Sequence, residues 1–296
     1  MDGFFLVDKP KKMTSQTVVS KIKRQFHLKK CGHSGTLDPD ATGLLVVACD
    51  SATKLMKFIN EHDKSYIATI IFGYNSNTLD ISGAITDEIE MKFDVEELDV
   101  KLKEFLEVDK QIPPMVSAIK IDGKKLYEYE RRNQKIDVPS RTVKIYDISR
   151  ISNLRLCSGH LEVDVLLKVS KGFYVRSFAR DLGISMGGIA ILKELRRIQS
   201  GNFTLVSATP LDELKEEHLL TIEEVFPYKK FEVNDYLAKL VKNGVVLDDR
   251  QLSTDQPFYV VHRGKIIALY EVIQKNLYKP VIIFKDGREE DENYKC

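Results

Sequence analysis

The stretch GHSGTLDPDATGLL, residues 32–45, places two carboxylates around a proline in a glycine-containing loop that runs directly into an apolar segment. Pro39 fixes its own φ and biases Asp38 toward an extended conformation, while the glycines permit tight turns and close approach of a ligand. Asp38 is therefore a candidate for a rigidly held nucleophile or base. The alternative is that Asp38 only forms an Asx turn before the proline. We expect Asp40 to point away or to cap the residues that follow it.

Two other kinds of active site share features with this loop. Residues 38–42 match the D-x-D-x-T pattern of phosphatases that use an aspartyl nucleophile. That chemistry places the first aspartate at the end of a buried strand and needs Mg²⁺ held by later carboxylates, whereas in this chain a loop precedes Asp38 and the pair Asp248 and Asp249 lies near the C-terminus. A serine-hydrolase elbow is also disfavoured, because residues 32–35 lack the G-x-S-x-G spacing.

Charge is distributed unevenly along the 296 residues, although the net charge is only +1. Residues 9–37 carry basic side chains and no acid, and residues 120–144 form a second basic region, while acids gather in 87–109 and in the C-terminal tail. Clustered Lys and Arg favour a polyanion on one face, because binding releases phosphate counterions. The alternative is that these residues form ordinary solvated helix faces.

The composition is that of a globular protein, with 43% hydrophobic and 30% charged residues. The four cysteines are far apart and form no C-x-x-C pair, so we expect neither a zinc site nor a disulfide framework. No long apolar segment or signal peptide is evident, which predicts a cytoplasmic protein without membrane spans.

Short strands mixed with amphipathic helices predict an α+β fold with a mixed, mainly antiparallel sheet rather than a regularly alternating α/β fold. The pattern of expected elements changes after Phe226-Pro227, where a short helix (234–242) precedes three compact strands (258–261, 266–272 and 278–284). We therefore expect a first domain over 1–228 and a small β-rich domain over 229–296. A basic stretch over about 111–141, opened by two prolines, is expected to be a partly helical surface insertion.

Several ordered motifs closely resemble the bacterial tRNA pseudouridine synthase B family. They span about residues 3–205 and are Asp8-Lys9-Pro10, Thr14-Ser15, Gly32 to Pro39, Ala41 to Leu45, Ala52-Thr53-Lys54, Lys64-Ser65-Tyr66, Gln111 to Pro114, Ser117 to Lys120, Leu126-Tyr127, Ser170 to Arg176, Leu195 to Arg197 and Ser200-Gly201. The resemblance implies a pseudouridine-synthase catalytic domain whose insertion at 111–141 is an RNA-gripping thumb. The C-terminal part resembles the PUA-like RNA-binding module of this family only in size and strand pattern.

The resemblance also implies an activity: isomerisation of the uridine at position 55 in the T arm of tRNA, on a nucleotide flipped out of the RNA. Because nothing is oxidised and no group is transferred, we expect no cofactor and no metal. The implied partner is the T stem-loop of tRNA, bound by a monomer without a guide RNA.

Site residues follow from the same resemblance. Asp38 would be the nucleophile, with Arg176 paired to it, since a neighbouring cation lowers a carboxyl pKa. Tyr66 would stack on the base and could accept a proton. His33 would help to extrude the nucleotide, and Tyr174 and Leu195 would line the uracil pocket. Lys9 and Pro10 are expected to brace the loop rather than to react.

This chain departs from the family pattern at three positions: Ser34 replaces a usual threonine, Asp40 a usual apolar residue, and Val116 a common aromatic residue. Asp40 either faces solvent or adds negative charge near Asp38. A protein that binds or folds RNA without catalysis is the alternative from another class, and it would not need Asp38, Tyr66 and Arg176 together. A guide-RNA-dependent relative is a further alternative within the enzyme class.

Overall fold

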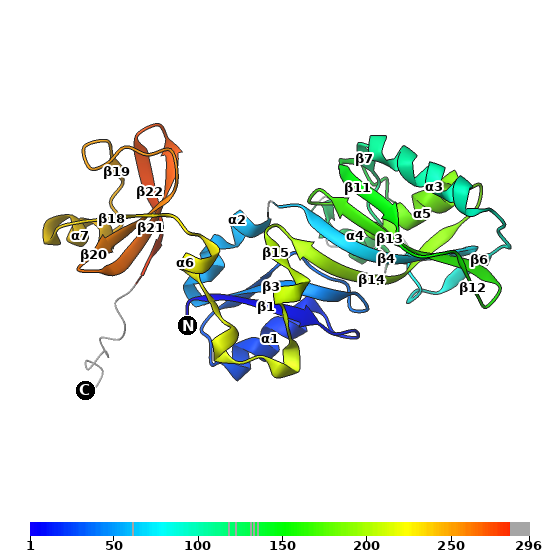
Figure 1. The fold of residues 1–296 in the computed structure, drawn as a ribbon, viewed down its shortest axis with the longest axis horizontal. Helices are drawn as coiled ribbons and strands as arrows, with labels where there is room; N and C mark the ends of the chain where they lie inside the picture. The colour runs from blue at the N-terminus through cyan, green and yellow to red at the C-terminus, as the bar shows by residue number, and fades with distance from the viewer. Residues whose placement is uncertain are drawn as a thin grey trace.

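The computed structural model describes residues 1–60, 62–117, 119–121, 123–130, 132, 134 and 136–284. Within them the expected α+β architecture is confirmed: a large, mainly antiparallel mixed sheet carries helices, and a second sheet follows near the C-terminus (Figure 1). None of the helices in these ranges is long and apolar enough to cross a membrane.

The large sheet has a central path of seven strands. In spatial order they are β11 (Ile145–Arg150), β13 (His160–Val169), β4 (Lys64–Phe72), β14 (Ala190–Ser200), β3 (Thr42–Cys49), β1 (Gly3–Lys9) and β16 (Thr209–Pro210). Four short strands pair beside this path: β2 (Cys31–Ser34) with β3, β12 (Arg155–Cys157) with β13, β15 (Phe203–Thr204) with β14, and β17 (Leu220–Thr221) with β1. Strand β14 joins the two halves, because it pairs antiparallel with β4 and parallel with β3.

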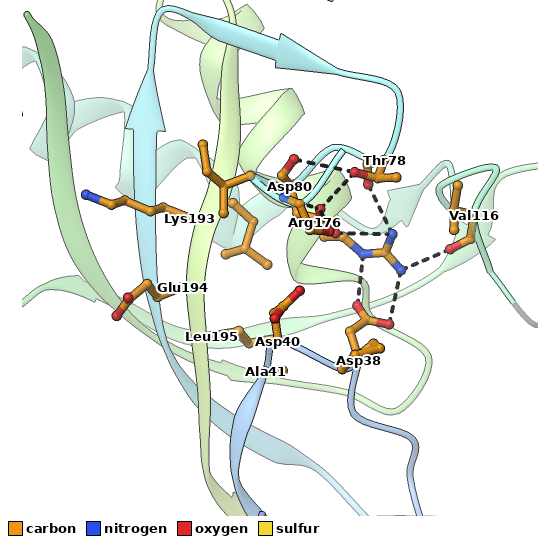
Figure 2. Close-up of a pocket in the computed structure, with 14 residues that line it drawn as sticks. Asp38, Asp40, Ala41, Thr78, Asp80, Val116, Arg176, Lys193, Glu194 and Leu195 are labelled. Atoms are coloured by element: carbon orange, nitrogen blue, oxygen red, sulfur yellow. Dashed lines mark hydrogen bonds and ion pairs between the residues drawn. The ribbon is translucent and has the colours of Figure 1, made fainter. Parts of the chain in front are cut away.

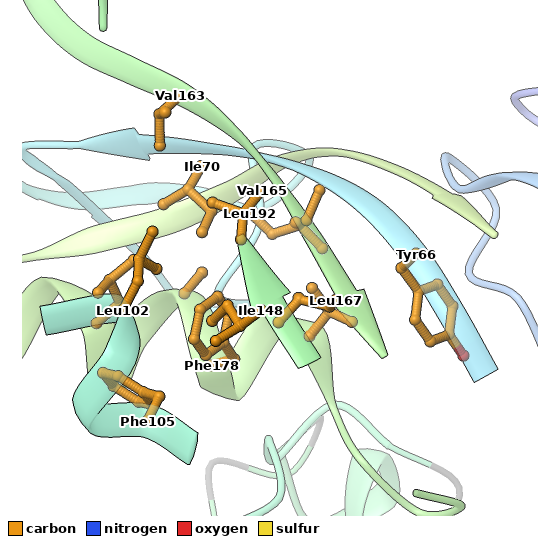
Figure 3. Packing of buried hydrophobic residues seen from close by; sticks show 14 of the residues in the cluster. Tyr66, Ile70, Leu102, Phe105, Ile148, Val163, Val165, Leu167, Phe178 and Leu192 are labelled. Carbon is orange, nitrogen blue, oxygen red and sulfur yellow. The ribbon is translucent and has the colours of Figure 1, made fainter. Parts of the chain in front are cut away.

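One half of the sheet packs its inner face against helices α3 (Val95–Glu104) and α5 (Val175–Ser185) and the 3₁₀ turn η2 (Phe105–Glu107) (Figure 3). Alternate residues of β13 are buried, as a strand with one covered face requires. Tyr66 lies at the end of this core, at the start of β4.

The other half is covered on both faces, which explains the nearly continuous apolar run of β3. Helix α1 (Ser15–Gln25) covers one face. Either Thr14 or Ser15 could cap this helix from the sequence, and it is Thr14 that does so, accepting a bond from the Thr17 backbone N–H at 3.0 Å. The opposite face packs against η1 (Asp50–Leu55), α2 (Met56–Asn60) and α6 (Ile222–Val225). Three further 3₁₀ turns, η3 (Leu205–Ser207), η4 (Leu211–Glu213) and η5 (Glu216–His218), lie in the segment that leads to α6.

The small C-terminal unit is a five-stranded sheet with one helix. In spatial order it contains β18 (Lys229–Glu232), β20 (Phe258–His262), β21 (Lys265–Gln274), β22 (Leu277–Ile283) and β19 (Leu247–Asp248), with α7 (Asp235–Lys242) beside them. The expected helix and three strands are present, and β18 and β19 were not expected. It has its own apolar core. It also contacts the first domain, because Tyr259 packs into the core around β3 and its hydroxyl donates to the Phe226 carbonyl at 2.7 Å.

The insertion begins and ends on a two-stranded ladder, in which β7 (Lys110–Gln111) pairs with β10 (Arg141–Thr142). Its described part contains the hairpin β8 (Lys120–Ile121) and β9 (Lys124–Lys125), followed by α4 (Leu126–Glu130). Of the motif residues expected in this insertion, Ala118 lies outside the described residues, as do several positions of the second basic region, among them 122, 131 and 135.

Two local predictions from the sequence need correction. The β-branched run 65–74 predicts one long strand, but β4 ends at Phe72, because Gly73 takes φ 91° and a β-carbon there would lie 2.5 Å from the His160 ring; a separate hairpin of β5 (Tyr74–Ser76) and β6 (Ile85–Glu88) follows. The β-rich runs 141–149 and 160–170 predict an antiparallel pair with a turn at Ser158-Gly159 between them; the pair is confirmed as β11 and β13, but the turn joins β12 to β13.

Candidate active site

The loop that carries Asp38 is held by a turn of its own and by a side chain from the first turn of α1. The Asp38 carbonyl accepts from the Ala41 N–H at 3.1 Å, which closes a β-turn with Pro39 at its second position. The buried Ser15 hydroxyl accepts a hydrogen bond from the Leu37 N–H at 2.9 Å and donates one to the Leu37 carbonyl at 3.1 Å. These bonds explain why the Thr14-Ser15 motif and the aspartate loop occur together.

Lys9 braces the same loop, as expected. Its side chain is fully buried, and its ammonium donates to the carbonyls of Pro10, Met13 and Pro39 at 2.6–3.1 Å. Burial lowers the pKa of Lys9 to about 8, against the opposing effect of the nearby Asp40 and Asp38 carboxylates. The loop therefore rests on a cation whose hydrogen bonds go to backbone carbonyls.

Arg176 in the first turn of α5 lies directly against Asp38 (Figure 2). Its Nε is 3.0 Å from Asp38 Oδ2, and its Nη2 is 3.4 Å from Oδ1, so the guanidinium edge meets both carboxylate oxygens. The Arg176 side chain is 7% exposed, whereas that of Asp38 is 44% exposed. The pair thus combines a buried, fixed cation with a carboxylate that remains open to the cavity.

Three further groups hold Arg176, and no sequence motif pointed to them. The guanidinium donates to the carbonyls of Thr78 and Val116, each at 3.0 Å, and its Nη1 is 3.7 Å from Asp80 Oδ2 (Figure 2). Asp80 is itself fixed by the Thr78 and Ser82 hydroxyls. Turn-forming residues after β4 were the available signal, but no spacing in the sequence links them to Arg176.

The charges around Asp38 oppose one another. Burial at the base of the cavity raises the pKa of Asp38 above its usual value; Arg176 lowers it, Asp80 raises it, and Lys9 and Asp40 have smaller effects of opposite sign. Asp40 therefore does add negative charge near Asp38, while its own side chain is exposed. Arg176 limits the rise and so favours the ionised carboxylate.

A cavity of about 700 Å³ opens above this pair. All the site residues expected from the sequence line it: His33, Asp38, Tyr66, Tyr174, Arg176 and Leu195. They come from β2, the loop after it, β4, the start of α5 and β14, which meet where the two halves of the sheet join. A smaller hollow of about 150 Å³ lies on the other side of Asp38, beside Asp80 and Leu195.

Arg197 in β14 braces the cavity from the other side. Its side chain is buried and donates to the carbonyls of Leu44 and Gly35, at 2.7 and 3.0 Å. Gly43 takes φ 98°, and a β-carbon there would lie 2.3 Å from the Arg197 carbonyl oxygen, so only glycine allows β3 to approach β14 so closely. Burial, and next the charge of Arg197, lower the pKa of His33, which favours a neutral imidazole.

The insertion is anchored beside the cavity through α5. The Ser177 hydroxyl donates to the Ile112 carbonyl at 2.8 Å, and the Tyr174 N–H donates to the Gln111 side chain at 2.8 Å. Burial raises the pKa of the Tyr174 phenol, which keeps it neutral. The base of the insertion is thus coupled to the helix that carries Arg176.

Chemically, the arrangement presents one ionised carboxylate, held on one side by a guanidinium, to a cavity lined by two tyrosines and a leucine. Among the described residues, no group of three or more His, Cys, Asp and Glu side chains could hold a metal ion. The geometry suits nucleophilic attack by Asp38 on a substrate bound in this cavity.

Comparisons with known proteins agree with this geometry. Residues 23–175 match the TruB family of pseudouridylate synthases (N-terminal domain). The chain is 41% identical to the tRNA pseudouridine synthase B of Aster yellows witches'-broom phytoplasma, over 96% of this chain and all of the relative. It is 36% identical to the protein of that name from Bacillus pumilus, over 98% of this chain and 99% of the relative.

Solved structures share the fold. A Cbf5–Nop10–Gar1 complex contains a chain with a TM-score of 0.65 and 23% identity, over 96% of this chain and 84% of that one. The archaeal box H/ACA Nop10–Cbf5 complex contains a chain with a TM-score of 0.63 and 22% identity, over 92% of this chain and 79% of that one. With full-length relatives above one third identity and a family match over residues 23–175, this chain belongs to the TruB family of pseudouridylate synthases.

Proposed function

We propose that this chain isomerises uridine to pseudouridine in tRNA, that its target is uridine 55 of the T arm, and that Asp38 is the nucleophile. The observation that carries the proposal is the Asp38 carboxylate, open to a cavity and paired at 3.0 Å with the buried Arg176. The curated relatives are named tRNA pseudouridine synthase B, which supports tRNA as the substrate.

The reaction needs only groups that line the cavity. Attack by the Asp38 carboxylate on the sugar or the base allows the bond from ribose C1′ to N1 to break. The base then turns, C5 bonds to C1′, and the bond between Asp38 and the substrate breaks, which restores the free carboxylate. The proton on C5 is then removed and N1 gains a proton, so that the product is an isomer of the substrate. Tyr66 in β4 stacks on the base, and its phenol accepts the C5 proton; the ring is 7% exposed and lines the cavity.

Arg176 keeps the nucleophile ionised and aimed. Its hydrogen bonds to the Thr78 and Val116 carbonyls fix the guanidinium before substrate binds, so the carboxylate needs no rearrangement during the reaction. Tyr174 and Leu195 shape the pocket for the uracil ring. Since both line the cavity beside Asp38, they confine the base within reach of the carboxylate.

The target nucleotide must leave the RNA stack to reach Asp38, which costs a few kcal/mol. His33 lies at the edge of the cavity and helps to extrude the nucleotide and to fill the space it leaves. Contacts to the T stem-loop offset the cost: the basic segment 9–37, the insertion 111–141 acting as a thumb, and the unit 229–296 acting as a PUA-like RNA-binding domain. The monomer recognises tRNA directly, without a guide RNA.

The decisive experiment uses the purified chain, an unmodified T-arm hairpin and buffer with no guide RNA or second protein. We expect pseudouridine at the position that corresponds to uridine 55, and none at other uridines. A protein that binds the hairpin without modifying it would favour the non-catalytic alternative. Modification only after addition of a guide RNA would favour the guide-dependent alternative.

A further inference from the structure

Two cysteines that the proposed reaction does not use face each other across neighbouring strands. Cys31 at the start of β2 is the register partner of Cys49 at the end of β3. The Asp50 N–H donates to the Lys30 carbonyl at 2.9 Å, so residues 30 and 50 form a hydrogen-bonded pair and the next pair, 31 and 49, is the non-hydrogen-bonded kind. Both thiols are free in this structure.

This position brings two thiols within bonding reach. At a non-hydrogen-bonded antiparallel pair the α-carbons are about 4.5 Å apart, and disulfides span about 4.4–6.8 Å. The two thiols lie close enough for each to affect the pKa of the other. A disulfide can therefore form between them without moving either strand far.

The two sulfurs lie in different surroundings. Cys31 is half-buried and lines a hollow of about 510 Å³ whose wall includes Lys23, Lys29 and Lys30, whereas Cys49 is fully buried in the core under α1. The hydrogen bond from Cys49 lowers the pKa of the Cys31 thiol; the same bond and burial raise the pKa of Cys49. An accessible thiol beside lysines and a buried thiol opposite it correspond to an attacking and a resolving cysteine.

We propose that Cys31 and Cys49 form a peroxide-sensitive dithiol, in which Cys31 reacts with hydrogen peroxide and Cys49 closes a reversible disulfide. The Cys31 thiolate attacks the O–O bond, an S–O bond forms, and the departing hydroxide takes the Cys31 proton to become water. The Cys49 sulfur then attacks Cys31, the S–S bond forms as the S–O bond breaks, and the second hydroxide leaves with the Cys49 proton as water. The two thiols are oxidised by two electrons and one peroxide is reduced to two waters.

Among the described strands, β2 pairs only with β3. The disulfide would add a covalent link between β2 and the core of the sheet. Strand β2 carries His33 and leads into the Asp38 loop, so the oxidised protein holds this edge of the cavity more rigidly than the reduced protein. The inference concerns thiol chemistry and does not depend on the proposed RNA reaction.

The test is peptide mapping of the folded, full-length protein after treatment with hydrogen peroxide and alkylation of the remaining thiols. We expect a linked peptide containing Cys31 and Cys49, lighter by two hydrogen atoms and restored by dithiothreitol. Cys157 is the internal control: it lies beside the Lys193 ammonium at 3.4 Å, but its register partner is His160, so it should not join a disulfide within the molecule.

Variants separate the two steps. In Cys49→Ala, Cys31 should stop at the sulfenic acid and be trapped by a dimedone probe, whereas in Cys31→Ser, Cys49 should remain reduced. The inference is overturned if the wild-type protein forms no 31–49 link under conditions that oxidise Cys157. It is also overturned if Cys49 oxidises equally well in Cys31→Ser.

Discussion

Replacing Arg176 by methionine should raise the pKa of the Asp38 carboxyl and move the acid limb of the pH–activity profile upward. The catalytic form of Asp38 is the ionised one, so activity is lost as the pH falls through its pKa. Burial already raises this pKa above the usual value of about 3.9, and Arg176 is the main group that opposes the rise. Without the guanidinium, only the smaller effect of Lys9 opposes the negative charge of Asp80 on Asp38.

The size of the shift follows from the geometry. At the observed 3.0 Å, Coulomb attraction amounts to about 1.4 kcal/mol in a water-like dielectric and about 5.5 kcal/mol at an effective dielectric constant of about 20. Because the Asp38 side chain is 44% exposed, solvent screening favours the lower part of this energy range. The pKa of Asp38 should therefore rise in Arg176→Met, and the acid limb should move in the same direction.

The assay is kcat/KM for pseudouridine formation on an unmodified T-arm hairpin, measured across pH at constant ionic strength. Arg176→Lys is the matched control, because it keeps a positive charge and should shift the limb less. Titration of the ¹³C-labelled Asp38 carboxyl by NMR gives the same pKa without relying on residual activity. If the titration curve of Arg176→Met overlays that of the wild-type protein, the electrostatic role assigned to Arg176 is wrong.

Four further outcomes are expected. Tyr66→Phe keeps the ring but removes the proton acceptor, so the single-turnover rate should fall by about 10²–10⁴ with hairpin affinity unchanged, and a retained rate would leave only the stacking role. Lys9→Met removes the ammonium that donates to three carbonyls and should lower the free energy of unfolding by about 1–3 kcal/mol in urea denaturation, whereas the exposed Lys11→Met should change it by less than about 0.5 kcal/mol. Gly43→Ala forces a β-carbon against the Arg197 carbonyl at positive φ and should cost more than about 1 kcal/mol in the same assay; an unchanged midpoint would contradict the close approach of β3 and β14. Hairpin affinity should fall steeply with salt, and Lys29→Glu should reduce the slope of log K against log salt by about 0.7–0.9 if that lysine neutralises one phosphate, whereas a flat salt response would argue against binding through phosphates.

Much of the local structure could be predicted because it depends on neighbours in sequence. The cap of α1 at Thr14, the turn at Pro39 and the strands after Phe258 each follow from short-range rules on side-chain caps, fixed φ and apolar spacing. The pairing of Asp38 with Arg176 was predicted from the family resemblance, not from the spacing of the two residues, which are 138 positions apart.

The groups that hold the site together could not be predicted in this way. Asp80 and Thr78 reach Arg176 only because Gly73 ends β4 and the loop between β5 and β6 pairs with Leu192 of β14, beside the start of α5. Arg197 becomes a buried brace only where β14 runs parallel to β3, a pairing that depends on the whole sheet. The contact of Tyr259 with the first domain was missed for the same reason. The pattern of expected elements changes at the boundary between the domains, but that change does not reveal which surfaces of the two domains are in contact.

The most direct test of the account is a single-turnover measurement of pseudouridine formation by Asp38→Asn, with Asp40→Asn as its matched control. Both variants remove one negative charge from the same loop, but only Asp38 meets Arg176 in the cavity. We expect Asp38→Asn to bind the T-arm hairpin with affinity close to that of the wild-type protein and to form no pseudouridine, while Asp40→Asn forms it at a rate near the wild-type rate. Pseudouridine formation by Asp38→Asn at a rate comparable to that of Asp40→Asn would contradict the central claim.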